Sequence, residues 1–186
     1  ATENKMKEGR FLRSLPLEEV TLAEALREEG YATYHVGKWH LGDGPDALPL
    51  KQGFDSYFGI PYSNDMWIHK DQAFAKNAQF FEGYTLEQVR SGEAGKRKDR
   101  GGKVPLMRDN EIIEYPVDQS FITQRYTDEA IQIISDSQRA NQPFFIYLAY
   151  SMPHVPLYTA PEFNGKSERG TYGDTLEEMD FHHQEY

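Results

Sequence analysis

The sequence predicts an α/β fold, a mostly parallel sheet flanked by helices, and three observations support this class. An amphipathic helix ending at Gly30 is followed at once by an apolar-alternating strand over 31–36. A longer amphipathic pattern over 118–140 precedes the near-continuous apolar run 144–149. The 186 residues can bury one sizeable core, and 38% of them are hydrophobic, as in globular proteins. We therefore expect a single domain built from helix–strand units.

The first helix has a defined beginning and end. Thr21 and Glu24 have the spacing of a capping box, in which each side chain accepts a hydrogen bond from the other's backbone N–H. Gly30 can adopt the left-handed conformation that ends a helix. The apolar face of this helix is expected to pack on the sheet through Leu22, Ala25 and Leu26.

The stretches between these units are less regular. The aromatic-rich segment 53–65 is predicted to be a packed loop near a pocket, and short strands are predicted at 104–106 and 111–115. The charged, glycine-rich run 93–102 is predicted to be a surface loop. The apolar run 144–149 is expected to form a strand buried on both faces.

Composition excludes several classes of partner and site. Lys and Arg total 20 against 30 Asp and Glu, a net charge of −10, which argues against a nucleic-acid partner. The sequence has no cysteine, so neither disulfides nor thiolate metal clusters are possible. No apolar run is long enough to cross a bilayer. An anionic substrate would therefore need a local cationic pocket on an acidic protein.

Protonatable side chains follow both predicted strands. Lys38 and His40 come directly after the first strand and are bracketed by glycines, and His154 follows the second strand between two prolines. If the strands are parallel, their carboxyl ends share one edge of the sheet, where ligands bind in open α/β folds. A solvated turn with one surface lysine and packed histidines is the alternative. Ser63 by itself would be read as a turn hydroxyl.

The run Gly37-Lys-Trp-His-Leu-Gly42 resembles the second signature of the formylglycine-dependent sulfatases. The resemblance extends over 15–31, 52–65, 143–156 and 172–180 in the family's order, and 52–65 is most similar to the arylsulfatase A branch. It implies an alkaline-phosphatase-like sandwich. It also implies sulfuric ester hydrolysis, with a sulfated small molecule or carbohydrate as substrate and a periplasmic, secreted or lysosomal location.

The resemblance assigns roles to four residues. Lys38 would bind a sulfate oxygen and stabilise the hydrated aldehyde, and His40 would move the proton that expels sulfate. His154 would hold the ester and assist the leaving oxygen, with Ser63 as a further contact. Fixed cationic donors suit a reaction that builds charge on sulfate oxygens.

Parts of the family pattern are missing from the sequence. The nucleophile motif, Cys or Ser-x-Pro-x-Arg, is absent, and Ser14 is rejected as a nucleophile because Glu18 stands where the arginine belongs. The family's calcium ligands are absent too, so both calcium and formylglycine are expected outside residues 1–186, with no metal site within them. His182 and His183 are given no metal role. The chain is interpreted as an incomplete sulfatase catalytic domain, inactive by itself.

Two alternatives stay open. A phosphodiesterase or phosphonate hydrolase of the same superfamily would share the fold and much of the pocket. A non-catalytic anion-binding relic would keep Lys38, His40 and His154 without a nucleophile. The run Gly59-Ile-Pro-Tyr-Ser63 favours the sulfatase interpretation.

Overall fold

A computed structural model describes residues 14–94 and 103–184, so most of the loop predicted at 93–102 lies outside the described residues. The strands are β1 (Ala32–Gly37), β2 (Ser56–Gly59), β3 (Phe74–Phe80), β4 (Leu106–Arg108), β5 (Glu111–Tyr115) and β6 (Phe144–Ala149). The helices are α1 (Leu22–Glu28), α2 (Leu86–Arg90), α3 (Ile122–Ala140) and α4 (Gly170–His183), with short 3-10 turns at Pro49–Lys51 and Gln119–Phe121. Within the described ranges, no helix combines the length and apolarity that a bilayer crossing requires.

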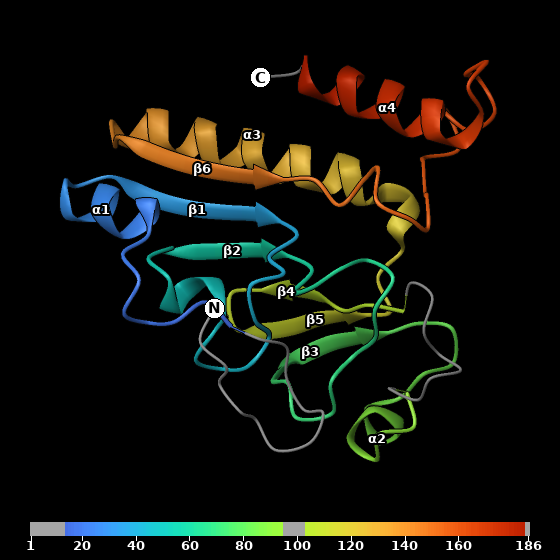
Figure 1. Ribbon diagram of the computed structural model, residues 1–186, viewed down its shortest axis with the longest axis horizontal. Helices are drawn as coiled ribbons and strands as arrows, with labels where there is room; N and C mark the ends of the chain where they lie inside the picture. The colour runs from blue at the N-terminus through green and yellow to red at the C-terminus, as the bar shows by residue number, and fades with distance from the viewer. Residues whose placement is uncertain (1–13, 95–102, 185–186) are drawn as a thin grey trace.

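All six strands form one sheet in the order β3-β5-β4-β2-β1-β6 (Figure 1). β1 pairs in parallel with β2 and with β6, and β3 pairs in parallel with β5. β4 is antiparallel to both of its neighbours, so the five other strands point in the same direction. The predicted class, a mostly parallel sheet flanked by helices, is confirmed.

The sheet has a hydrophobic core on each face. On the face covered by α1, Ala23 belongs to a cluster with Tyr57 and Trp39. On the other face, Ile122 and Tyr126 of α3 pack with the β2 residue Phe58. Tyr57 and Phe58 belong to the cores on opposite faces of the sheet because successive side chains of a strand point to opposite faces.

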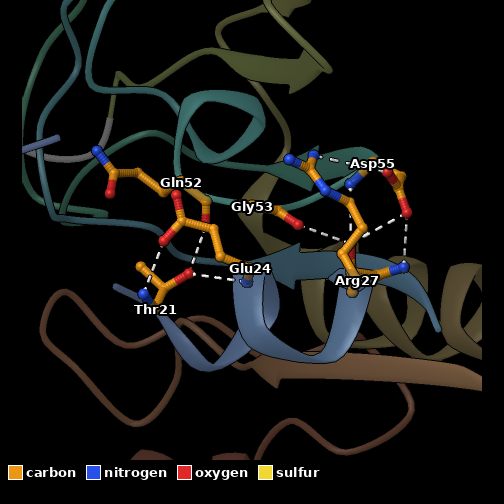
Figure 2. A network of polar contacts seen from close by, with 7 residues as sticks. Thr21, Glu24, Arg27, Gln52, Gly53 and Asp55 are labelled. Atoms are coloured by element: carbon orange, nitrogen blue, oxygen red, sulfur yellow. Dashed lines mark hydrogen bonds and ion pairs between the residues drawn. The ribbon is translucent and has the colours of Figure 1, made fainter. Parts of the chain in front are cut away.

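The predicted capping box of α1 is present and also fastens the helix to the sheet (Figure 2). The Thr21 hydroxyl accepts a hydrogen bond from the Glu24 N–H at 3.1 Å and donates one to the Gln52 carbonyl at 2.8 Å. Further along the helix, the guanidinium of Arg27 lies 3.8 Å from the carboxylate of Asp55. These contacts hold α1 against the segment that leads into β2.

The predicted inward face of α1 is wrong in two of its three positions. Leu22 and Ala25 are exposed, whereas Ala23 is buried and Leu26 is half-buried. The backbone of Gly53 packs so closely on Glu24 that an added Cβ would lie 2.5 Å from the Glu24 nitrogen. This contact sets the rotation of the seven-residue helix, overriding its apolar pattern.

Three strand predictions need correction. The segment predicted as a loop at 53–65 contains β2, and β3 was not predicted because its apolar and polar residues do not alternate strictly. β6 is confirmed as a strand, but it lies at the sheet edge and its Tyr147 is 51% exposed, so it is not buried on both faces. The short strand predicted at 111–115 is β5, whereas the one predicted at 104–106 overlaps β4 only at Leu106.

Candidate active site

Lys38 and His40 lie directly beyond the carboxyl end of β1, between the segments that follow β6 and β2. The Lys38 N–H donates to the Ala149 carbonyl at 2.8 Å, and the His40 N–H donates to the Pro61 carbonyl at 3.1 Å. His40 adopts φ of 56°, an uncommon conformation for a residue with a side chain. Backbone hydrogen bonds on both sides thus hold Lys38 and His40 at the edge where the parallel strands end.

Gly37 makes this close approach possible. Its φ is 116°, and an added Cβ would lie 1.9 Å from the Ala149 carbonyl oxygen. Gly59 of β2 is equally close on the other side, because a Cβ there would lie 1.8 Å from the Gly37 oxygen. Only glycine fits where the three strand ends meet.

Ser63 comes from the loop after β2, and His154 comes from the loop after β6. The Ser63 hydroxyl is buried and lies 3.4 Å from Nε2 and 3.5 Å from Nδ1 of His154. The Asn64 side chain donates to the carbonyls of His154 at 3.2 Å and Pro156 at 3.1 Å. The neighbour of Ser63 therefore positions the loop that carries His154.

The charges of the cluster influence one another. Burial is the main cause that lowers the pKa of His40, and the nearby charges of Lys38 and His154 lower it further, whereas Asp65 opposes this shift. The pKa of Lys38 is lowered by burial, against the attraction of Asp65. The pKa of Asp65 is raised by burial, but a hydrogen bond from Ser63 and the charges of His154 and Lys38 outweigh that effect and lower it.

The structure thus brings together the four residues singled out from the sequence, and it adds two that the sequence analysis missed. Asp65 faces the cations of the cluster, and the fully buried Asn64 holds the His154 loop. The sequence signal for Asp65 was its position two residues after Ser63. The structure places both residues in one turn, in which the Met66 N–H donates to the Ser63 carbonyl. His35 is buried in β1. His182 is buried, whereas His183 is exposed.

The described residues do not fit a calcium site. Among them, no group of three or more His, Cys, Asp or Glu side chains is placed to hold a metal ion. Calcium requires six to eight oxygen ligands, whereas Asp65 lies among nitrogen-bearing side chains. The calcium ligands stay predicted for segments outside these residues.

This site and fold define an α/β protein with a lysine, two histidines and a serine at the carboxyl ends of parallel strands. The family described as Sulfatase matches residues 2–183, and the chain belongs to this sulfatase family. Similar proteins include mouse Arylsulfatase G, 36% identical over 169 residues, and human Arylsulfatase A, 38% identical over 169 residues. The matches to both cover 89% of this chain and 31% of the relative.

Solved structures agree with this assignment. The crystal structure of Ps i-CgsB in complex with k-i-k-neocarrahexaose matches with a TM-score of 0.69 and 27% identity, over 91% of this chain and 36% of that chain. PsFucS1 sulfatase from Pseudoalteromonas sp. has the same fold, with a TM-score of 0.67 over 96% of this chain and 36% of that chain. The predicted alkaline-phosphatase-like fold is confirmed. The chain spans about a third of the length of the curated relatives named above.

Proposed function

We propose that the protein carrying this chain hydrolyses sulfate esters, with carbohydrate sulfates as the substrate class. The observation that carries the proposal is the convergence of Lys38, His40, Ser63 and His154 from three strand ends on one spot. Family membership supports the reaction. A relative, dog N-acetylgalactosamine-6-sulfatase, is 35% identical over 176 residues, and the Ps i-CgsB structure holds a neocarrahexaose.

Each residue has a chemical task in this proposal. The Lys38 ammonium binds the sulfate oxygens, where charge increases in the transition state. His154 and Ser63 bind the ester, and Nε2 of His154 gives a proton to the leaving oxygen. His40 accepts a proton as a base, a role that its lowered pKa suits near neutral pH. The formylglycine of the family would supply the nucleophile, and calcium would supply charge stabilisation, from segments outside the described residues.

The test uses the full-length protein and a chromogenic aryl sulfate. We expect wild-type turnover and a loss of kcat/KM of at least roughly a hundredfold in Lys38→Ala, the size expected when a transition-state donor is removed. Lys51→Ala, in the 3-10 turn Pro49–Lys51, is the matched control and should keep wild-type turnover. Equal rates for Lys38→Ala and wild type would contradict the role of Lys38.

A bis-aryl phosphate assayed in parallel separates the two enzyme classes. Faster hydrolysis of the phosphate diester than of the sulfate would favour the phosphodiesterase alternative. Absence of turnover on both, combined with measurable sulfate binding that Lys38→Ala abolishes, would favour the non-catalytic anion-binding alternative.

A further inference from the structure

A second pocket lies at the same edge of the sheet, beyond the ends of β3 and β5. Its volume is about 420 Å³. Phe81 and Glu82 directly follow β3, and Pro116 to Gln119 directly follow β5. Its lining includes Phe81, Glu82, Lys103, Glu114, Asp118 and Tyr158. Because β3 and β5 run parallel to β1, this pocket opens at the edge that also carries Lys38 and His40.

The pocket and the candidate active site share a wall. Gln119, which lines the pocket, donates a hydrogen bond to the Asn64 carbonyl at 3.0 Å. Asn64 in turn donates to the carbonyls of His154 and Pro156. Tyr158, four residues beyond His154 on the same loop, lines the pocket directly. The loop that carries His154 therefore connects the candidate active site with the pocket.

The lining is aromatic and acidic. Phe81 is 44% exposed, and Tyr158 is partly exposed, so both offer apolar surface to a ligand. The described lining residues include the carboxylates of Glu82, Glu114 and Asp118 and the ammonium of Lys103. This combination can bind a sugar ring, whose faces are apolar and whose hydroxyls donate hydrogen bonds to carboxylates.

The pocket is acidic, whereas a site for a second anion would be cationic. Lys103 is in an ion pair with Glu82, and Arg125 binds Glu114 through two hydrogen bonds of 2.5 and 2.7 Å. Asp118 receives one bond, from the Ser120 N–H at 2.9 Å, and lies exposed. Its negative charge would repel a sulfate or carboxylate placed nearby.

We propose that this pocket binds an uncharged sugar ring next to the sulfated one, and that Asp118 selects against a second anionic group there. The proposal rests on the proposed sulfate-ester hydrolysis and adds a substrate class to it. Substrates would be oligosaccharides in which the ring beside the cleaved ester carries neither sulfate nor carboxylate. Phe81 and Tyr158 would supply affinity for the sugar ring, and the carboxylates would discriminate against a ring that carries a sulfate or carboxylate.

The experiment compares three substrates of the full-length protein: nitrophenyl sulfate, a monosulfated disaccharide with a neutral second ring, and the same disaccharide with a sulfate on the second ring. In the wild type, we expect kcat/KM for the neutral-ring disaccharide to exceed that for the disulfated one by at least about tenfold. In Phe81→Ala and Tyr158→Ala, the ratio of kcat/KM for the neutral-ring disaccharide to that for nitrophenyl sulfate should fall about tenfold.

Asp118→Asn tests the charge selection. Asparagine keeps the oxygen that accepts from the Ser120 N–H and removes the negative charge. It should raise kcat/KM for the disulfated disaccharide relative to the neutral one by roughly three- to tenfold, the size of one screened charge interaction. Asp128→Asn makes the same change at an exposed position of α3 outside the pocket and should leave this ratio unchanged.

The outcomes distinguish a failure of the pocket assignment from a failure of the proposed sulfate-ester hydrolysis. A wild-type protein that hydrolyses none of the three substrates overturns both the proposed function and the pocket assignment. A wild type that cleaves nitrophenyl sulfate, with substrate ratios that none of the pocket variants changes, overturns the pocket assignment alone. Circular dichroism melts of each variant verify that the comparison is made between folded proteins.

Discussion

The hydroxyl of Ser63 lies 3.4 Å from Nε2 of His154, although 91 residues separate them in sequence. Nδ1 of the same ring lies 2.6 Å from the Val155 carbonyl oxygen, a distance at which Nδ1 must carry a proton and donate. In the neutral ring Nε2 is therefore the acceptor, and it becomes a donor when the ring is protonated. His154 is thus placed to give a proton from Nε2 while its ring orientation is fixed by Val155.

This geometry predicts an effect of His154→Ala that depends on the leaving group. A nitrophenolate leaves with little protonation, whereas an alkyl or sugar oxygen needs a proton in the transition state. We expect kcat/KM to fall by roughly a hundredfold or more for an alkyl or sugar sulfate and by less than about tenfold for nitrophenyl sulfate. Ser63→Ala serves as the comparison, since loss of a sulfate contact should affect both substrates by a similar factor. If His154→Ala lowers kcat/KM by the same factor for both substrates, His154 only binds the ester and does not protonate the leaving oxygen.

Asp65→Asn should shift the titration of His40. Asp65 raises the pKa of His40 against the lowering effects of burial and Lys38, so removal of its charge should lower that pKa further. The limb of the pH–rate profile that follows His40 should move to lower pH, and an NMR titration of the ring should move with it. Asp46→Asn, at an exposed position of the loop after Gly42, is the control and should leave the titration in place. A shift of the limb to higher pH would contradict the assigned electrostatics.

Gly37→Ala should destabilise the fold more than Gly30→Ala, although both glycines have positive φ. At Gly30 an added Cβ meets nothing within 4 Å, so the cost is the backbone strain alone, on the order of 1 kcal/mol. At Gly37 the Cβ would also collide with the Ala149 carbonyl oxygen and push β1 away from β6, adding several kcal/mol. Urea denaturation of the two variants measures the difference, and equal midpoints would show that the strand ends can separate without cost.

His35 should make the fold sensitive to acid. Its ring lies 5.1 Å from that of Trp39 and 5.2 Å from that of Tyr57, centroid to centroid, and burial lowers its pKa to about 3 from 6.5. Above pH 6.5 the ring is neutral in both folded and unfolded chains and contributes no pH dependence. Between pH 6.5 and 3 the unfolded chain binds a proton that the folded chain does not, so stability falls as pH falls, by on the order of 1 kcal/mol per pH unit.

His35→Phe removes this contribution, because phenylalanine fits an aromatic environment without a proton to gain. Denaturation midpoints measured from pH 7 to pH 4 should decline less in His35→Phe than in wild type. His183→Gln, at an exposed position of α4, should follow the wild-type decline. Parallel curves for His35→Phe and wild type would place the acid sensitivity elsewhere.

Much of the fold and of the site could be predicted because it is encoded locally. The capping box of Thr21 and Glu24, the alternation in β1 and the helical spacing of α3 each depend on neighbours within a few residues. Lys38 and His40 could be placed at a sheet edge because the strand and its terminal glycine are adjacent to them in sequence. The expectation that the two strands are parallel placed His154 at the same edge, and the family resemblance added Ser63.

Only the tertiary structure decided the parts that depend on partners distant in sequence. The rotation of α1 follows from the contact between Gly53 and Glu24, and the exposure of Tyr147 follows from the place of β6 at the sheet edge. Asn64 donates a hydrogen bond to the carbonyl of His154, some ninety residues away, and the charge of His154 lowers the pKa of Asp65. A pattern read along the chain reports short-range preferences, whereas burial and electrostatic coupling depend on which distant segments the fold packs together.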